Sequence, residues 1–432
     1  IMSVCYQIRK KFLNSGVPNM AQVLPFQAVR PQQQFVSQVA SLPYDVMTRE
    51  EGQKAVAGNA LSFMHVEKSE IDVPDGTKSN DDLIYQTAKR NFIDMRIKGI
   101  LIQDESPCFY IYRQKMGSQV QIGIVGLMSA AEYDAGKIKK HELTRKDKEE
   151  DRIRHVDTVN AQTGPVFISY REKQGLNQIV TQITAGTPEY DFTAEDGVTH
   201  TVWVVADKKR IEEIKKEFIE VDALYIADGH HRAAAATTIA RGRRAQDKSS
   251  GSLKEYEGVL AVFFPHTQLK VMDYNRAVKD LNGLTPEQFI EKISHSFTIV
   301  KNFKPRSPQQ FHDFGMYLGG EWYKLTIKEG VYNAGDPVAS LDAAILQDYL
   351  LDPVLTIKDP RVDDRIKFIG GIRGMDELEK LVNKDGFAVA FSLYPTTMEQ
   401  IIKVADAGAI MPPKSTWFEP KLRSGIFTHR LD

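Results

Sequence analysis

Five consecutive residues carry the groups best suited to chemistry in this chain of 432 residues: Asp228-Gly229-His230-His231-Arg232. The two imidazoles can donate hydrogen bonds or carry protons, and the guanidinium is a planar, two-pronged donor. The Asp228 carboxylate can cap a helix or orient a histidine. This set fits the binding of an anion, above all a phosphate. The alternative is a capped turn that carries surface histidines.

The neighbouring residues explain how these groups would be positioned. A short apolar run at 224–227 suits a buried strand, and an alanine-rich run at 233–240, followed by Arg241-Gly242-Arg243-Arg244, predicts a helix with a basic end. A strand that turns through glycine into a helix start leaves free backbone N–H groups and the positive end of the helix dipole facing the turn. The sequence therefore predicts a phosphate-binding turn at 228–232.

Common catalytic signatures are absent from the sequence. It contains no Gly-x4-Gly-Lys-Ser/Thr, Gly-x-Gly-x-x-Gly, His-Glu-x-x-His or Gly-x-Ser-x-Gly motif. Cys5 and Cys108 provide neither a disulfide framework nor a thiolate metal site. His230 and His231 with Asp228 could hold a metal, but adjacent histidines rarely converge on one ion. We therefore expect no metal site built from protein ligands alone.

Composition bounds the class of protein and its partners. The chain has 56 basic and 57 acidic residues and a net charge of −1, so no overall field favours nucleic acid or a membrane surface. No apolar run approaches the roughly 20 residues that span a bilayer. A cytosolic protein of two or three domains is expected. We place an N-terminal extension at 1–20, with Met20 as a possible start, a nucleotide-binding region at 21–275 and a C-terminal region at 276–432.

Periodicity predicts the elements of the first region. Thr48 and Glu51 have capping-box spacing, so a helix is expected to start there, and Asp45 just before it has either a turn role or a site role. Helices are expected at 81–98 and 208–217. Strands are expected at 23–26, 108–113, 120–127, 256–264 and 269–274, the second and third forming one hairpin and the last two another.

The last third alternates helices with short strands. Thr285 followed by Pro286 marks a helix start. Further helices are expected at 341–350, 375–382 and 397–407, and strands at 387–393 and 425–428. The fold class is thus α/β or α+β, with a mixed sheet in the first region and an α+β layer in the second.

The central turn resembles a known signature. Gly229-His230-His231-Arg232 before an alanine-rich helix is similar to the Gly-x-x-Arg motif of the ParB/sulfiredoxin-like superfamily, which holds nucleotide phosphates on such a turn. Sulfiredoxins have a cysteine where this chain has His230, so their thiol chemistry does not carry over. The free-serine kinase branch has a Gly-His pair and is the better match. The resemblance implies a core of that superfamily with insertions.

A second resemblance covers about residues 21 to 432. The chain is identified as a member of the family called domain of unknown function 1015, because it contains the motifs of that family in order: Pro25-Phe26, Pro43-Tyr44-Asp45-Val46, His141-Glu142-x-Thr144, Asp151-Arg152, Asp228 to Arg232, Leu351-Asp352-Pro353-Val354, Ile366-x-Phe368-Ile369-Gly370-Gly371 and Met411-Pro412-Pro413-Lys414-Ser415-Thr416. It departs near Asp273 to Ala277, where many relatives have Pro-Thr-His-Arg. Arg276 is retained, but the histidine that precedes this arginine in those relatives is absent.

The resemblance to the kinase branch also implies a catalytic base. His141-Glu142 is similar to the His-Glu pair of that branch, in which the glutamate is the base, so Glu142 is our candidate base and His230 and Asp228 are candidate catalytic partners. Thr144 and Arg152 lie close by in sequence. His141, Glu142, Thr144 and Arg152 all lie in the charge run at 137–155. On charge alone, such a run is typical of a solvated helix.

Lys414, Ser415 and Thr416 could hold a phosphate from the opposite wall of a site. A structural loop that docks Trp417 and Phe418 explains the same residues equally well.

Two function classes follow. The first is a phosphotransferase that uses a nucleotide triphosphate or diphosphate with Mg²⁺ and phosphorylates a small hydroxylated metabolite, for which the kinase branch suggests a free amino acid such as serine. The second is a ParB-like regulatory module that binds a nucleotide without turnover. The oligomeric state is left open by the sequence.

Overall fold

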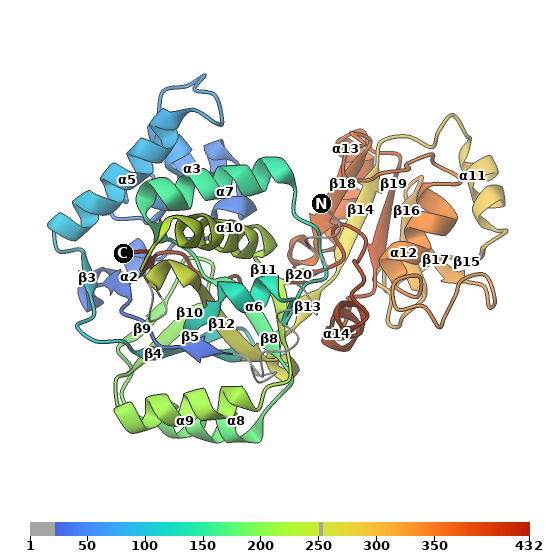
Figure 1. Ribbon diagram of the computed structural model, residues 1–432. Coiled ribbons are helices and arrows are strands. Elements are labelled where there is room, and N and C mark those ends of the chain that lie inside the picture. Colours follow the sequence, from blue (N-terminus) through green and yellow to red (C-terminus); the bar gives the residue numbers. More distant parts are fainter. Residues whose placement is uncertain (1–21, 250–253) are drawn as a thin grey trace.

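The computed structural model describes residues 22–249 and 254–432, and our expectations for residues 1–20 lie outside them. Two bodies of secondary structure lie side by side (Figure 1). The first is built on a nine-stranded sheet in which β11 is parallel to β6 and β12 is parallel to β8, while the other pairs are antiparallel. From edge to edge its strands are β6 (Ile138–Lys139), β11 (Leu224–Asp228), β8 (Val166–Tyr170), β12 (Gly258–Pro265), β5 (Gln119–Ser129), β4 (Phe109–Met116), β10 (Thr199–Val205) and β9 (Tyr190–Thr193), and β1 (Val23–Leu24) pairs with β5.

One face of this sheet packs against the helices at 174–184, 208–219 and 230–246, and the other packs against the N-terminal segment, the helix at 398–406 and the C-terminal residues. The short helices are α2 (Val36–Val39), α3 (Arg49–Ala55), α4 (Met64–Glu67) and α6 (Ala130–Asp134), and the longer ones are α5 (Asp82–Ile97), α7 (Lys146–Val159), α8 (Gln174–Thr184), α9 (Lys208–Ile219) and α10 (His230–Gln246). Ala233, Ala236 and Ala240 of α10 are buried in the same core as apolar residues of α8 and α9. Their small side chains let the α10 backbone lie close to the sheet.

The second body has a six-stranded sheet in which every pair is antiparallel. Its strands, in spatial order, are β15 (Phe297–Lys301), β17 (Glu321–Ile327), β16 (Asp313–Leu318), β19 (Val389–Leu393), β14 (Tyr274–Val278) and β18 (Ile366–Gly370). Its helices are α11 (Pro286–Ile293), α12 (Asp342–Leu346), a π-helical turn at Gln347–Leu351, α13 (Met375–Lys384) and α14 (Met398–Asp406). The two sheets confirm the mixed α/β fold class with an additional antiparallel layer.

The C-terminal tail, defined here as residues 409–432, returns from the second body to the first. Within it β20 (Trp417–Phe418) pairs with β13 (Val271–Met272), and β21 (His429–Arg430) pairs with β7 (Ala161–Gln162). Ile426 and Phe427 of the tail are fully buried against the face of the first sheet that α10 does not cover. A small pair, β2 (Val29–Pro31) with β3 (Leu101–Gln103), lies on the same body. The boundary that we expect near Asn275 falls within β14.

Most predicted elements are confirmed, and three are not. The expected hairpin of 256–264 with 269–274 is wrong, because β12 is a central strand between β8 and β5, and β13 pairs with the tail. Residues 425–428 are not a strand; Thr428 makes a single bridge to Val29. The charge run at 137–155 is only partly helical, since α7 begins at Lys146 and β6 precedes it.

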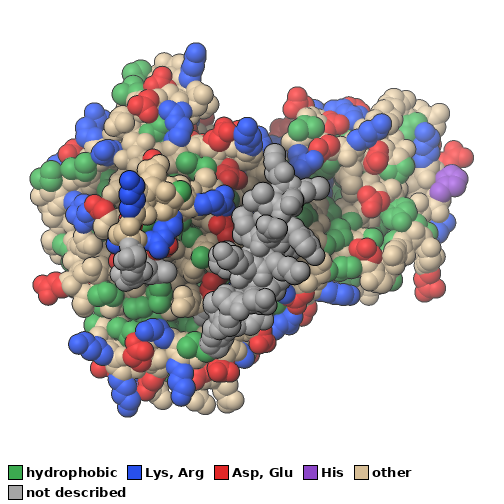
Figure 2. Space-filling view, viewed as in Figure 1, with side chains coloured by type: hydrophobic (Ala, Val, Ile, Leu, Met, Phe, Trp, Pro, Cys, Tyr) green, Lys and Arg blue, Asp and Glu red, His purple; other side chains and the backbone are tan. Residues whose placement is uncertain are grey.

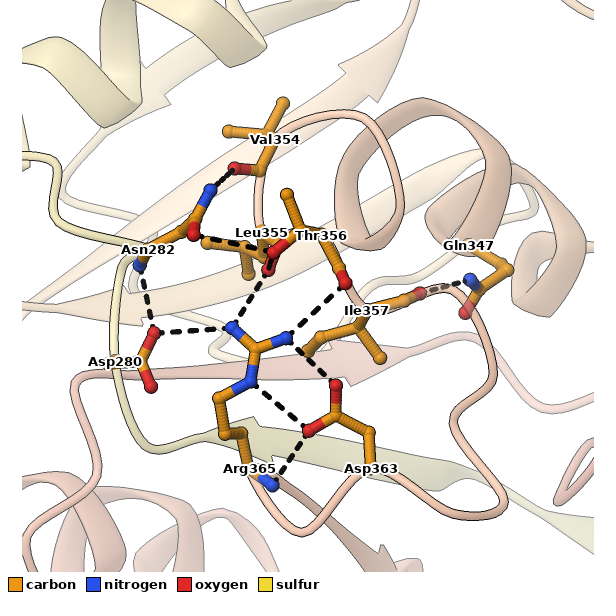
Figure 3. A network of polar contacts seen from close by, with 9 residues as sticks. All are labelled: Asp280, Asn282, Gln347, Val354, Leu355, Thr356, Ile357, Asp363 and Arg365. Atoms are coloured by element: carbon orange, nitrogen blue, oxygen red, sulfur yellow. Dashed lines mark hydrogen bonds and ion pairs between the residues drawn. The ribbon is translucent and has the colours of Figure 1, made fainter.

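One loop of the second body is fixed by a single guanidinium (Figure 3). Arg365 binds the Asp363 carboxylate through Nε and Nη2, at 3.1 and 2.8 Å, and it donates to the carbonyl of Leu355 at 3.0 Å and to that of Thr356 at 3.3 Å. The Asp280 carboxylate, two residues after the end of β14, lies 3.5 Å from Nη1 of Arg365. These contacts tie the loop at 352–365 to the sheet, and the loop in turn forms part of the wall described next.

Candidate functional site

A cavity of about 1240 Å³ lies between the two bodies. The predicted phosphate turn and Glu142 line it from the first body, and β18 and the loop held by Arg365 line it from the second. Over the described part of the face in Figure 2, Lys and Arg are mixed with Asp and Glu. No helix in the described residues is long and apolar enough to cross a membrane.

The predicted strand, turn and helix at the centre of the site are confirmed. β11 ends at Asp228, Gly229 adopts a φ of 88°, and α10 begins at His230. That φ lies in the left-handed region, which glycine enters without the strain that a side chain adds. No side chain caps the first turn of α10 within the described residues. The first backbone N–H groups of a long helix are therefore available to an anion.

Asp228 is held by a lysine of the C-terminal tail. Its Oδ1 accepts from the Gly229 amide at 2.8 Å, and its Oδ2 accepts from Lys421 Nζ at 2.9 Å. Burial alone raises the pKa of Asp228, but the Lys421 ammonium overcomes this effect and holds that pKa well below its usual range. Asp228 is therefore an ionised anchor for the turn and a poor proton acceptor.

Arg232 points back from the first turn of α10 toward two carboxylates. Its Nη1 donates to the Pro165 carbonyl at 3.1 Å, while Nη2 lies 3.6 Å from Glu67 and 4.0 Å from Asp45. Burial lowers the pKa of Arg232, yet Asp45 and Glu67 raise it above its usual value, so the group stays charged. Nη2 is buried and has no hydrogen-bond partner among the described residues. One donor is thus left for a ligand.

His141, Glu142 and His230 meet because the edge strand β6 is parallel to its neighbour β11. Ile138 of β6 is paired with Leu224 of β11, so the residues that follow each strand leave at the same edge of the sheet. The rings of His141 and His230 have centroids 4.6 Å apart and are nearly perpendicular. His230 Nδ1 lies 3.8 Å from Glu142 Oε2.

Burial governs the protonation of this trio. It lowers the pKa of His141 to about 4 and that of His230 well below its ordinary value, and it raises the pKa of Glu142. Both imidazoles are therefore neutral near pH 7. The carboxyl of Glu142 is a stronger proton acceptor than an exposed glutamate once it is ionised.

Three other predicted residues are near the cavity but engaged elsewhere. His231 Nε2 accepts from the Arg145 amide at 3.0 Å, and Thr144 donates to Glu149 at 2.8 Å. Arg152 lies 3.9 Å above the Tyr44 ring and donates to the neighbouring Asp151. Burial lowers the pKa of His231.

The tail residues predicted to hold phosphate divide into two groups. Lys414 and Thr416 line the cavity, and Lys414 makes no ion pair within the described residues, its Nζ lying 5.7 Å from the Tyr274 ring centroid. Ser415 is buried and donates to the Pro412 carbonyl at 2.7 Å, so the structure does not bring it to the cavity wall. The retained Arg276 donates to the Lys414 carbonyl at 3.1 Å, which explains its role in holding this loop.

Sequence reasoning missed three residues of the site: Tyr44, Glu67 and Lys421. Tyr44 was within a quoted motif, but its position between Arg152 and Arg232 is visible only in the fold. Glu67 is buried and accepts from the Thr163 hydroxyl. Lys421 is 193 residues from Asp228, and nothing local marks it.

Solved structures of low similarity include three of interest. A free serine kinase in complex with AMP is 13% identical, with a TM-score of 0.35, over 68% of this chain and 86% of that chain. A conserved hypothetical protein from Pyrococcus furiosus is 14% identical, with a TM-score of 0.34, over 70% and 93%. SbnI from Staphylococcus aureus, with a C-terminal truncation, is 11% identical, with a TM-score of 0.36, over 68% and 82%.

A search of curated proteins found no match. One family model does match, and it spans residues 23–344, well over half of the chain. Its description is "Protein of unknown function (DUF1015)". The motifs that the model covers include the central turn and the His141-Glu142 pair around which the cavity is built. The chain belongs to this DUF1015 family.

Proposed function

We propose that the protein is a phosphotransferase, which binds a nucleotide in the cavity and transfers its terminal phosphoryl group to the hydroxyl of a small metabolite. One observation carries the proposal: the uncapped start of α10, with a free donor on Arg232, opens into the same cavity as the Glu142 carboxyl. An anion site and a proton acceptor in one cavity are the two parts that this reaction needs. A free amino acid such as serine is the first acceptor to test, on the strength of the motif resemblance.

The residues divide the work as follows. The first amides of α10, together with Arg232 and Lys414, hold the phosphates and offset their charge. Glu142 takes the proton from the acceptor hydroxyl as that oxygen bonds to the terminal phosphorus. The bond from phosphorus to the leaving nucleotide then breaks, and the electron pair stays with the leaving oxygen. His230 lies beside Glu142, with Nδ1 3.8 Å from Oε2, and is the candidate partner that would orient the carboxylate.

Magnesium would accompany the nucleotide and neutralise charge on its phosphates. The donor set fits this ion, because Mg²⁺ prefers oxygen ligands and the Asp45 carboxylate lines the cavity half exposed, with Arg232 4.0 Å away and no hydrogen bond of its own among the described residues. Asp228 is less suited, since Lys421 and the Gly229 amide already occupy its oxygens.

Residues 21–275 would supply the nucleotide site, and residues 276–432 would supply the second wall and the tail lysines. Lys414 and Lys421 both reach the cavity from that C-terminal part. A cytosolic location, where nucleotides and free amino acids are abundant, agrees with this reaction.

The test is direct. The purified protein is incubated with Mg²⁺, each common nucleoside triphosphate or diphosphate and a pool of hydroxylated metabolites, and phosphorylated products are identified by mass spectrometry. Glu142→Gln should bind nucleotide with unchanged affinity but lose turnover, because the amide keeps the size and removes the proton acceptor. Unchanged turnover in this variant would assign Glu142 to the solvated charge run.

A regulatory module is the second candidate, and the Lys421–Asp228 contact favours it. This contact joins the phosphate turn to the tail, so a bound nucleotide that shifts the turn also acts on the tail. Tight nucleotide binding with no product from any acceptor, and a change in protease cleavage of the tail on binding, would support the module over the enzyme.

A further inference from the structure

The trio of His141, Glu142 and His230 has a property that phosphoryl transfer does not use. Each residue offers a ligand atom, and these atoms all lie within 4.8 Å of one another. Two are imidazole nitrogens and one is a carboxylate oxygen. We propose that the trio is a binding site for a divalent transition-metal ion of the Zn²⁺ class.

The first support is the lack of other partners. His141 and His230 are 2% and 5% exposed. Neither ring nitrogen of His141, nor Nε2 of His230, makes a hydrogen bond of ordinary geometry within the described residues, although the Ile226 carbonyl faces His141. Buried polar atoms are rarely left in this state, because each costs about 1–3 kcal/mol. A metal ion takes up nitrogens of this kind from neutral rings.

The second support is that Asp228 and His231, which flank His230 in the sequence, already have other partners. Asp228, the other carboxylate beside His230, is held by Lys421 and by the Gly229 amide. His231 points elsewhere and accepts from the Arg145 amide. Glu142 has no hydrogen bond in the described residues, and its one ion-pair contact there is with His230, at 3.8 Å. The trio shares Glu142 and His230 with the proposed phosphotransfer site and adds His141.

The geometry needs only modest closure. Zinc binds histidine nitrogen and carboxylate oxygen at about 2.0–2.2 Å, which places tetrahedral ligands roughly 3.4 Å apart. Starting from separations of at most 4.8 Å, the ligand atoms must close by up to about 1.4 Å. Glu142 and His230 both line the cavity, so the fourth position would face it and stay open to water or a ligand.

The ligand types select the ion. Two imidazoles with one carboxylate favour Zn²⁺, Co²⁺ or Ni²⁺ over Mg²⁺ and Ca²⁺, which prefer oxygen. This ion would differ from the Mg²⁺ that accompanies a nucleotide, and the inference does not rest on the proposed function. In the zinc-loaded protein the Glu142 carboxylate would be a metal ligand, and in the zinc-free protein it would be free, so the same cavity would exist in two states.

The experiment uses the full chain, stripped with a chelator and free of nucleotide. Zn²⁺ is titrated against a competing chromophoric chelator, and Co²⁺ is added separately to record its visible absorption. The parent should bind one Zn²⁺ with submicromolar Kd, bind Mg²⁺ at least 1000-fold more weakly, and give the intense cobalt bands of a four-coordinate site.

Two variants and one control decide the location. His141→Ala and Glu142→Ala should each weaken Zn²⁺ binding at least 100-fold and remove the cobalt bands. His231→Ala, which removes an adjacent histidine outside the trio, should bind Zn²⁺ like the parent. Glu142 is partly exposed, so its variant should fold even if loss of the buried His141 ring does not allow folding.

Zinc affinity in Glu142→Ala equal to that of the parent, or loss of binding only in His231→Ala, would overturn the proposal. Absence of any one-to-one Zn²⁺ binding in the parent would do the same. Neither result bears on phosphotransfer, which is measured with Mg²⁺ and nucleotide.

Discussion

The two bodies each contain an arginine that reaches several partners, and the two are paired differently. In the first body, Nη2 of the buried Arg232 makes no hydrogen bond and only long ion pairs to Glu67 and Asp45, and both ring nitrogens of His141 and Nε2 of His230 lack ordinary hydrogen bonds. In the second, the Arg365 guanidinium is satisfied by two carboxylates and two carbonyls in one loop. An arginine with an unused donor beside a cavity is a candidate to bind a ligand, whereas one whose donors all meet carboxylates and carbonyls holds structure. The comparison predicts that arginines of the two bodies fail in different ways.

The largest effect is expected at Arg232. Charge-assisted hydrogen bonds contribute about 1.5–3 kcal/mol, so Arg232→Ala should weaken nucleotide binding by roughly tenfold to over a hundredfold. Arg232→Lys should restore only part of this, because an ammonium lacks the planar fork. Calorimetry at fixed ionic strength measures both. Equal nucleotide affinity in the parent and Arg232→Ala would remove the basis for the phosphate turn.

Arg365→Ala should instead lower stability. Loss of its hydrogen bonds to Asp363 and to two loop carbonyls should reduce the free energy of unfolding by about 1–3 kcal/mol. Arg361→Ala is the matched control, since Arg361 is more exposed and binds only Asp359, and it should change stability by less than about 0.5 kcal/mol. Urea unfolding compares them. A similar loss of unfolding free energy in both variants would mean that the Arg365 network stabilises the protein no more than the exposed Arg361–Asp359 pair does.

Acid should weaken the first body more than the second. His200 is buried between the Tyr112 hydroxyl and the Arg423 guanidinium, and burial, aided by Arg423, lowers its pKa to about 3. The unfolded imidazole protonates below about pH 6.5 while the folded one stays neutral, so stability falls as the pH drops from 6.5 toward 3. Between pH 7 and 5.5 this histidine should cost about 1 kcal/mol.

The check is urea unfolding of the parent and of His200→Gln at both pH values. The glutamine variant should show a smaller loss on acidification, whatever its stability at pH 7. His295→Gln, at an exposed position on the second body, serves as the control and should keep the loss seen in the parent. An identical pH dependence in all three proteins would contradict the assignment.

The smallest effect is expected at Lys414. Its ammonium lines the cavity without an ion pair, so Lys414→Ala should weaken nucleotide binding by roughly threefold to tenfold and leave the melting temperature nearly unchanged. Lys367→Ala removes an exposed lysine of β18 that also lines the cavity and should have less effect. Equal losses would show that the cavity attracts anions through diffuse charge. A sharp fall in melting temperature with normal affinity would make the tail loop structural.

The local features of the site were predictable from the sequence. An apolar run marks the strand before Asp228, a glycine marks the turn, and a high alanine content marks the helix that follows. All three elements are confirmed. The capping box of Thr48 with Glu51 is also confirmed, because it depends on residues three positions apart. The antiparallel pairing of β4 with β5 follows from a two-residue turn between alternating runs.

Features that depend on distant pairing were not predictable. β12 is apolar on both faces, so its sequence does not indicate which strand it pairs with. We expected it to pair with the next predicted strand in the sequence, and this expectation is wrong. The meeting of His141 with His230, 89 positions later, requires β6 to lie parallel to β11. Lys421 reaches Asp228 only because the tail folds back. In each case the decisive contact carries no local signature in either segment.

The return of the C-terminal tail has a consequence for how the protein is made. Residues 409–432 leave the ribosome after everything else described here, yet they supply Lys421 to the turn at Asp228 and Phe427 to the core beneath the first sheet. Until these residues are synthesised, the part of the apolar sheet face that they cover stays exposed in the nascent chain. A chain cut or stalled before residue 409 should lack a finished cavity even where both sheets have formed, so competence for ligand binding reports that translation has passed this point.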